Sequence, residues 1–267
     1  MASRALKLWA GLGALAGACG ALLVWAPAAW LASALATATE QRFILADARG
    51  TVWSGSAVPV LTGGVGSHDA SALPGRLHWT LGLDGGALAL RARHACCING
   101  ELLLRVKPGL GRLRIELPAA TGSIGQWPAS WLAGLGTPWN TVQPAGSLQL
   151  SSPGLTMESV QGRWRFDGRA QLDLSGMSSR MSTLDVLGSY SLVLAGSPKT
   201  GGAEAGATLQ LATSSGALQL TGEGQWVAAK LRFTGQASAA PGSEAVLNNL
   251  LNIIGRRQGA RSVISIG

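Results

Sequence analysis

The sequence contains few aromatic side chains other than tryptophan: tyrosine occurs once and phenylalanine three times, against ten tryptophans. Proteins that bind single-stranded nucleic acid stack bases on aromatic side chains, so the chain offers little material for such a platform. The net charge of +8 would still attract a phosphate backbone. However, the arginines are spread along the chain and alternate with apolar residues, as on the solvated face of a sheet. We therefore predict no nucleic-acid partner.

Charged residues are also scarce, at 13% of the chain against the usual quarter. The 267 residues include 38 glycines, and hydrophobic residues make up 47%. A chain poor in glutamate and lysine and rich in glycine is unlike a soluble helical protein, and it favours strands and tight turns. The length allows one large all-β domain or two small ones besides a membrane segment.

Cysteine occurs three times: Cys19 lies in the apolar N-terminal segment, and Cys96 and Cys97 are adjacent. No CxxC spacing is present, and the stretch around His94 offers too few ligands for a metal. Neighbouring strand residues point to opposite faces, so a disulfide between Cys96 and Cys97 would need a distorted turn. We favour two small buried residues here and keep a vicinal disulfide as the alternative.

Enzyme motifs are missing from the sequence. It has no nucleophile elbow, P-loop, dinucleotide fingerprint or zinc-protease motif. The three histidines, His68, His78 and His94, are far in sequence from paired carboxylates, and we interpret each as a surface residue. Asp167 is interpreted as a turn residue beside exposed arginines. We predict no enzyme, no catalytic residue, no cofactor and no metal.

A long uncharged stretch follows two basic residues at the N-terminus. After Arg4 and Lys7, no charge occurs from Leu8 to Thr39. A transmembrane helix needs about 20 residues, whereas the core of a cleaved signal peptide has roughly 7 to 15. We therefore predict that residues 1–39 form a cytoplasmic stub and an uncleaved inner-membrane anchor, and that residues 40–267 are periplasmic. A cleaved leader is the alternative.

Alternation of apolar and polar residues dominates from Arg42 onward, which predicts about a dozen short antiparallel strands with one buried face. Turn signals occur at 84–86, 167–168, 215–216 and 223–224. A Trp- and Pro-rich connection separates two strand groups, about 40–121 and 145–267, which could form two sub-units. We predict a mainly β fold: a curved antiparallel sheet or sandwich with short helices near 128–135 and 243–254.

The C-terminal segment predicts a helix followed by a last strand. Ser243 fits the N-cap position and Gly255 the position just past the helix end. Arg256 and Arg257 then follow the negative end of the helix dipole, where cations stabilise a helix and anions do not bind. We interpret the two arginines as a helix stop, with a binding site or docking peptide as the alternative.

Four stretches in this order resemble the type II secretion system (general secretion pathway) protein N family across essentially the whole chain. They are "GTVWSG" (50–55), "LPGRLHW" (73–79), "LGTPWNTVQPAGSLQL" (135–150) and "LNNLLNIIGRRQGARSVISIG" (247–267). The positions of this family pattern to which we assign a structural or partner-contact role are Trp53, Pro138, Trp139, Asn140, Gly255, Arg256 and Arg257.

The resemblance implies a non-catalytic inner-membrane component of the machinery that exports folded proteins from the periplasm of Gram-negative bacteria. It implies partners among the other inner-membrane platform subunits and among secretin-side components. "GTVWSG" alone also resembles the start of AsmA-like β-rich envelope proteins, so lipid handling in a β groove is the alternative function. A continuous apolar inner surface, open along one side, would favour that alternative, and a filled core would count against it.

Overall fold

The computed structural model of the chain describes residues 13, 17, 20, 24–160, 163–196, 207–227 and 230–266. Most of the predicted anchor, which precedes residue 24, lies outside the described residues. Within the part that is described, every helix is too short or too polar to cross a membrane. The anchor therefore stays a prediction.

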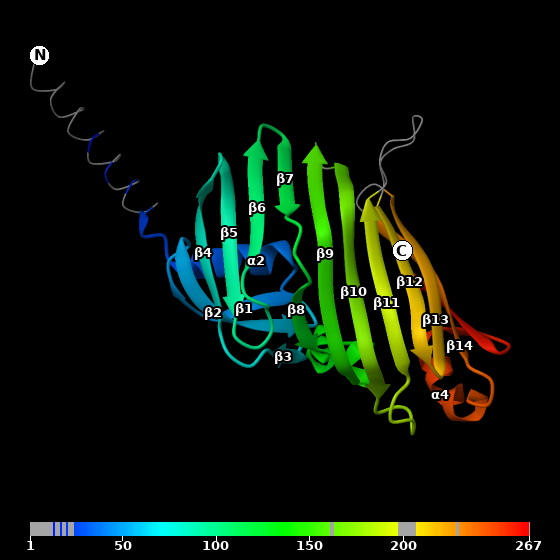
Figure 1. Cartoon of the computed structure of the whole chain (residues 1–267). Coiled ribbons are helices and arrows are strands. Elements are labelled where there is room, and N and C mark those ends of the chain that lie inside the picture. Colours follow the sequence, from blue (N-terminus) through cyan, green and yellow to red (C-terminus); the bar gives the residue numbers. More distant parts are fainter. Residues whose placement is uncertain are drawn as a thin grey trace, which may run out of the picture.

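The described strands form a single antiparallel sheet with sixteen members (Figure 1). Along the sheet the order is β1-β2-β4-β5-β6-β7-β9-β10-β11-β12-β13-β14-β16-β15, while β3 pairs with β2 and β8 with β9. The bounds are β1 (Phe43–Gly50), β2 (Ser54–Thr62), β3 (Ala70–Ala72), β4 (Leu77–Asp84), β5 (Ala87–His94), β6 (Leu102–Gly109), β7 (Arg112–Leu117), β8 (Ser123–Pro128), β9 (Pro144–Val160), β10 (Arg163–Ser179), β11 (Gly188–Gly196), β12 (Ala207–Gly216), β13 (Leu218–Val227), β14 (Lys230–Ala239), β15 (Arg256–Gln258) and β16 (Arg261–Ile266).

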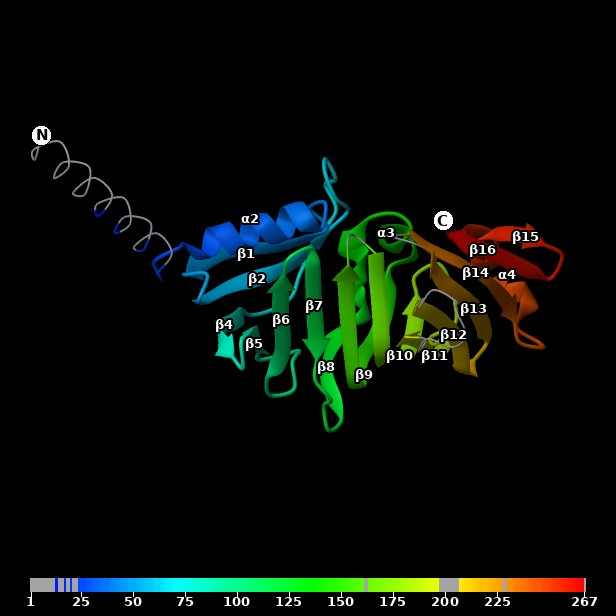
Figure 2. The same cartoon turned by 90° about the horizontal axis from the view of Figure 1, so that it is seen from above.

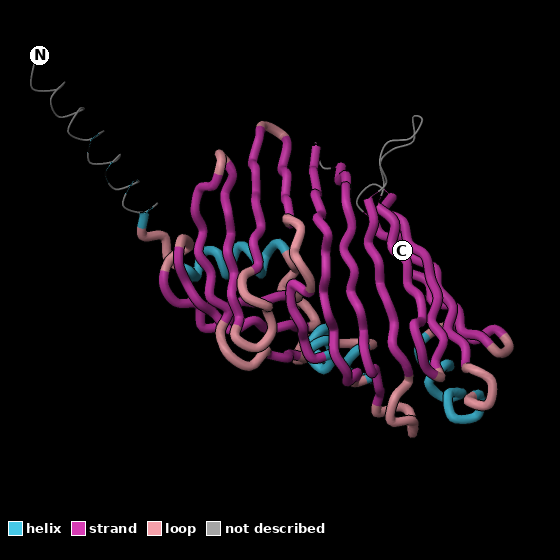
Figure 3. Tube along the Cα trace, in the orientation of Figure 1, coloured by secondary structure: helices cyan, strands magenta, loops and turns pink. Residues whose placement is uncertain are grey.

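The sheet is strongly curved and stays open. Seen from above, it curls from β1 and β2 at one end, through the middle strands, to β14, β16 and β15 at the other (Figure 2). Strands make up most of the described chain, and helices are few (Figure 3). The predictions of a mainly β chain and of a curved antiparallel sheet are confirmed. The structure is one open sheet and not a sandwich of two.

Strand β9 joins the two predicted strand groups. It is 17 residues long, and its C-terminal part pairs with β7 while its N-terminal part pairs with β8. Strand β10 runs along its other edge for nearly the full length. Because one strand pairs with both groups, the backbone hydrogen bonds are continuous across the boundary between the proposed sub-units.

Two of the predicted turns lie inside continuous strands. Asp167 and Gly168 are within β10, and Glu223 and Gly224 are within β13. Gly168 has φ +96°, a side chain there would collide with the Gly154 carbonyl, and the register with β9 shifts next to it. The glycine lies next to a β-bulge between Arg169 and Gln171, and its positive φ and its contact with Gly154 require a residue without Cβ. The turns predicted at 84–86 and 215–216 are confirmed as hairpins.

Four short helices accompany the sheet in the described part of the chain: α2 (Ala28–Ala38), the 3-10 helix η1 (Ala129–Leu135), α3 (Trp139–Val142) and α4 (Glu244–Ile254). The helices predicted near 128–135 and 243–254 are confirmed. Helix α2 was not predicted to touch the sheet, because its residues fall in the proposed anchor. It passes behind β5 and β6 in Figure 1, and its apolar side packs on β1, β2 and β4.

Two buried clusters lie on the same face of the sheet, which we call the inner face. The N-terminal cluster lies under α2 and comprises Ala28, Leu45, Ala57 and Trp79. The C-terminal cluster includes Leu247, Leu250 and Leu251 of α4, packed against β9–β14 with Leu148, Met177, Leu187, Tyr190, Leu218 and Ala237. Helices therefore cover the two ends of the inner face, α2 at one and α4 at the other.

Candidate functional site

The first family stretch, "GTVWSG", forms the corner between β1 and β2. The amide of Val52 donates to the Ala26 carbonyl at 2.8 Å, just before α2, and the Leu81 amide of β4 donates to the Trp53 carbonyl at 2.7 Å. Trp53 is 38% exposed. The corner thus ties the start of α2 to the first hairpin and to β4, which is a structural role.

Close packing explains the second glycine of this stretch. Gly55 is paired with Trp79, and a Cβ on Gly55 would lie 2.5 Å from Trp79 Cζ2. The same Cβ would lie 2.8 Å from the Arg49 carbonyl oxygen and 2.9 Å from that of Thr51. Trp79 is buried, and its Nε1 donates to the Val52 carbonyl at 3.1 Å. The indole therefore fills the space that a side chain at position 55 would take.

The second stretch, "LPGRLHW", holds the same corner from β4. Arg76 donates to Asp47 Oδ2 at 2.7 Å and to the Ser56 carbonyl at 3.1 Å. Hydrogen bonds from Arg49, and next from Arg76, hold the pKa of the Asp47 carboxyl below its ordinary value. The sequence patterns did not single out Arg76, although an arginine between Gly75 and the apolar strand was a visible signal.

The mid-chain stretch attaches the connection to β2 and β3. Asn140 Nδ2 donates to Asp69 Oδ2 at 3.0 Å, and Trp131 Nε1 donates to the Ser71 carbonyl at 3.0 Å. Pro138 precedes α3 and is exposed, and Trp139 in its first turn is 38% exposed. Asn140 thus has a structural contact, whereas Trp139 presents part of its ring to solvent.

The C-terminal stretch differs from its prediction. Arg256 and Arg257 do not stop the helix in solvent; they form β15, which pairs with β16 as a hairpin. Gly255 is extended, with φ −172°, and is not in the left-handed conformation of a helix cap. A Cβ there would lie 2.5 Å from the Val263 carbonyl oxygen, so the close strand explains the glycine. The Ser243 side chain makes no capping hydrogen bond. The predicted last strand is confirmed as β16.

The seven family positions therefore lie in three separate places. Trp53 is at the β1–β2 corner, residues 138–140 are in the connection, and residues 255–257 are at the far end of the sheet. The structure does not bring them together into one site. Their shared property is that each stretch joins elements distant in sequence.

An apolar cavity of about 430 Å³ lies on the inner face between α2 and strands β4–β6. Leu31 and Leu35 of α2 line one side, and Leu90 and Leu104 of the sheet line the other. Phe43 and Trp131 meet edge to face nearby, with ring centroids 6.3 Å apart. The sequence patterns did not predict this cavity, because α2 was assigned to the membrane anchor.

His94 lines this cavity and corrects the prediction that each histidine is at the surface. It is 4% exposed, and neither ring nitrogen has a hydrogen-bond partner among the described residues. Burial, and next the charge of His78, lowers the pKa of His94. His68 and His78 are exposed, as predicted. The signal was present: His94 has the same strand parity as Leu88, Leu90 and Ala92, which face inward.

Cys96 and Cys97 form a disulfide, so the favoured interpretation of two buried thiols is wrong. Cys97 is buried and Cys96 exposed. The chain turns here after β5, and strand alternation therefore does not apply. The sulfurs and a His94 nitrogen lie within 4.8 Å of one another. Because the sulfurs are bonded to each other, His94 is left as the single free ligand of that group.

The middle of the inner face carries a row of apolar residues on six neighbouring strands. We call it the apolar row; it runs across β4, β5, β6, β7, β9 and β10 and comprises Leu83, Leu88, Val106, Ile115, Met157 and Phe166. Five of the six are half-buried, and Leu83 is 82% exposed. The row lies between the ends covered by α2 and α4.

Charged residues occupy the opposite, outer face of the same strands. Arg105 pairs with Asp84 at 3.1 Å, and Arg114 pairs with Glu116 at 2.7 Å. These pairs are partly exposed and contribute little to stability. They do show that the alternation seen in the sequence divides the sheet into an apolar inner and a charged outer face.

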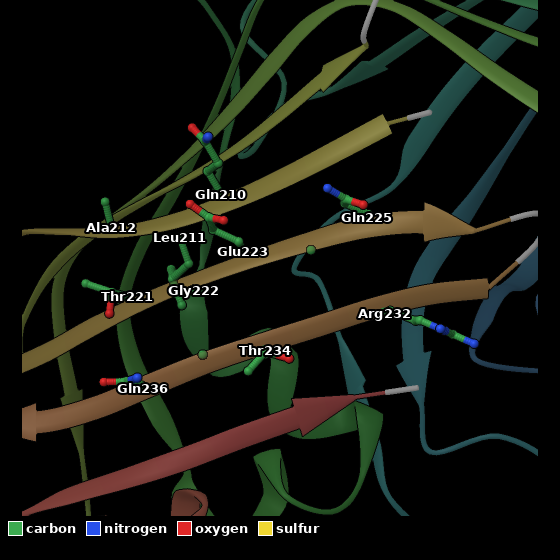
Figure 4. Close-up of a pocket in the computed structure, with 12 residues that line it drawn as sticks. Gln210, Leu211, Ala212, Thr221, Gly222, Glu223, Gln225, Arg232, Thr234 and Gln236 are labelled. Carbon is green, nitrogen blue, oxygen red and sulfur yellow. The ribbon is translucent and has the colours of Figure 1, made fainter. Parts of the chain in front are cut away.

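A second hollow, of about 880 Å³, lies across β12, β13 and β14 and is polar (Figure 4). Gln210, Glu223 and Thr234 are neighbours across its strands. Its charged side chains are Glu223 and Arg232, and histidine and cysteine are absent from its lining in the described chain. Among the described residues, this hollow is lined mainly by glutamine, threonine and glycine besides these two charged side chains.

The comparisons with known proteins give one family. The family model described as "Type II secretion system (T2SS), protein N" matches residues 42–264, which is most of the chain. Searches of curated proteins and of solved structures gave no significant match.

Proposed function

The chain belongs to the type II secretion system protein N family, and on that premise we propose that it is a non-catalytic inner-membrane subunit of the secretion machinery. The match over residues 42–264 is the observation that carries this proposal. The uncharged residues that precede α2, from Leu8 to Pro27, support an anchor with the sheet in the periplasm. In this role the protein contacts other platform subunits, and secretin-side components are a second group of partners.

The ends of the sheet supply a means of contact. Strand β1 pairs only with β2 among the described strands, and β15 covers only Arg261–Val263 of β16. An extended segment of a partner can add to such an edge through main-chain hydrogen bonds. We therefore expect a partner strand to pair beside Ser265.

Deletion of the gene tests the proposed function. Folded exoproteins should accumulate in the periplasm, while general envelope integrity persists. Complementation with the full chain should restore export. Normal export by the deletion strain would reject the role in secretion.

A matched pair of photo-crosslinking positions tests the edge contact. Ser265 and Thr234 are exposed cross-strand neighbours, but β14 is paired on both sides at Thr234. A photoreactive residue at Ser265 should crosslink to a secretion subunit in intact cells, and one at Thr234 should not. Equal crosslinking from both would indicate contact through the outer face.

The membrane topology has its own test. Reporter fusions should place the N-terminus in the cytoplasm and residue 240 in the periplasm. A mature protein that begins near Thr37 and is released with periplasmic contents would reject the anchor.

Lipid handling in the β groove is a second candidate function. The apolar row favours it, because these side chains form an apolar inner surface that no described helix covers. Normal secretion combined with lipid-dependent leakiness of the outer membrane in the deletion strain would support this candidate over the first.

A further inference from the structure

We infer that the cavity under α2 binds a single long-chain fatty acid, with the carboxyl group at His94 and the hydrocarbon chain directed along β5 and β6 toward the apolar row. The source of the ligand rests on the proposed inner-membrane location. The binding site itself is argued from the cavity, the histidine and the apolar row.

The cavity surface is that of a hydrocarbon site. Its described lining is leucine, isoleucine, alanine, proline and aromatic side chains, with His94 as the one ionisable group among them. The indole N–H groups of Trp79 and Trp131 are directed to backbone carbonyls, those of Val52 and Ser71. Their rings therefore present carbon to the cavity. An apolar cavity of about 150 Å³ already binds benzene, so about 430 Å³ accommodates a much larger apolar group.

The dimensions fit one extended acyl chain. Leu88 of the apolar row is six positions from His94 along β5, a distance of about 20 Å at the usual rise of a strand. One leaflet of a bilayer has a hydrocarbon thickness of about 15 Å, which is the length that one acyl chain covers. A chain whose head lies at His94 therefore passes Leu90, which is about 13 Å away along β5, and extends toward the apolar row.

His94 supplies what a carboxyl head group needs. A buried polar group without a hydrogen bond is costly, and both nitrogens of this ring lack partners in the described chain. A neutral imidazole offers one donor and one acceptor, which matches a protonated carboxyl group. If the proton passes to the ring, the resulting carboxylate and imidazolium form a pair of zero net charge. Either state satisfies His94 without leaving a buried charge unpaired.

The distribution of charge limits the direction of entry. On β6 and β7, the charged residues Arg105, Arg114 and Glu116 face outward, opposite the apolar row. An acyl chain that enters over the row thus meets apolar side chains from β4 to β10. The same chain on the outer face would cover ion pairs and leave them unsolvated.

In the test, the full-length protein in native membranes is labelled with a photoactivatable palmitate analogue. Leu104 lines the cavity, and its neighbour Leu103 lies on the opposite face of β6. Leu104→Trp fills the site and should reduce labelling about tenfold or more, whereas Leu103→Trp should stay within about twofold of wild type. Circular dichroism and resistance to protease serve as the control that both variants fold. Equal labelling of the two variants would overturn the proposal.

His94→Leu tests the position of the head group. Labelling by the palmitate analogue should fall about three- to tenfold, as for one lost hydrogen bond. A second probe, a photoactivatable alkane of the same length without the carboxyl group, should label this variant as well as it labels wild type. Equal effects on both probes would reject the assignment of His94.

Two further outcomes concern the identity of the occupant. Labelling by a photoactivatable phospholipid but not by palmitate would reject a fatty acid as the occupant. Crosslinks from these positions to a protein subunit would reject a lipid altogether. Export by the same strains is measured separately, so failure of the lipid site and failure of the secretion role give different results.

Discussion

Replacing Gly55 by alanine should destabilise the fold, because the new methyl group has no space. It would lie 2.5 Å from Trp79 Cζ2, with the Arg49 and Thr51 carbonyl oxygens at 2.8 and 2.9 Å. Overpacking of this kind costs roughly 1–3 kcal/mol of folding stability. Because the methyl group makes three such contacts, we expect a cost near the upper end, about 3 kcal/mol. Loss of glycine entropy in the unfolded chain returns about 0.5–1 kcal/mol. The net loss should be about 2 kcal/mol, or about a thirtyfold change in the unfolding equilibrium.

Urea unfolding of the detergent-solubilised full chain, followed by circular dichroism and tryptophan fluorescence, measures this loss. Gly82→Ala is the matched control: it lies on β4, an added Cβ there would have no neighbouring atom within 4 Å, and its φ is not positive. That variant should stay within about 1 kcal/mol of wild type, on the stabilising side. Adding Trp79→Leu to Gly55→Ala should relieve only the ring contact, since both carbonyl contacts remain. Identical midpoints for Gly55→Ala and Gly82→Ala would refute the packing argument.

Four further predictions concern the core, the tail and two titrating groups. Leu250→Ala should cost about 2–5 kcal/mol in urea unfolding because Leu250 is 1% exposed, whereas Ile253→Ala on the open side of α4 should cost far less. Truncation after Gly255 removes β16, the partner of β14, and should destabilise the whole fold; a truncated chain that stays folded but fails in secretion would instead indicate a docking peptide. Burial raises the pKa of Tyr190 above its ordinary value of 10.0, so the folded state retains a proton that the unfolded state loses, and stability should fall above pH 10 by up to about 1.4 kcal/mol per pH unit. Because Tyr190 is the one tyrosine, tyrosinate absorbance reads this group directly, and Tyr190→Phe should abolish the dependence. The lowered pKa of His94 has the opposite effect on the pH dependence of stability, because the unfolded chain binds a proton at this group more readily than the folded chain. Stability should be retained above pH 6.5 and decline as the pH falls below it, and this decline should be smaller in His94→Leu.

The elements that depend on local pattern could be predicted from the sequence. Alternation assigned most strands and their two faces, and glycine-rich turns placed the hairpins at 84–86 and 215–216. The apolar spacing of Leu247, Leu250 and Leu251 correctly predicted the buried side of α4, whereas Val246, which was predicted to share that side, is 40% exposed. The family was also recognisable, since its stretches carry unusual combinations of tryptophan, proline and glycine.

The elements that cover the inner face of the sheet could not be predicted from local pattern. Periodicity shows that Leu113, Ile115 and Leu117 share a face, but it does not say whether a second sheet, a helix or solvent lies over them. The packing of α2 was hidden because its apolar residues serve a membrane anchor and a core equally well. His94 was misjudged because histidine is usually exposed, although its position in the alternation pointed inward. The irregular strand at Gly168, next to a bulge, was mistaken for a turn because both use a glycine with positive φ.

The strand order has a consequence for how this chain folds. Neighbours in the sheet are nearly always neighbours in sequence, and the order departs from the chain only at β3, β8 and the exchange of β15 and β16. A polypeptide delivered N-terminus first can therefore extend its sheet hairpin by hairpin, without waiting for a distant segment. Up to β14 the growing edge is the most recently delivered strand, and the hairpin of β15 and β16 is added to that edge last.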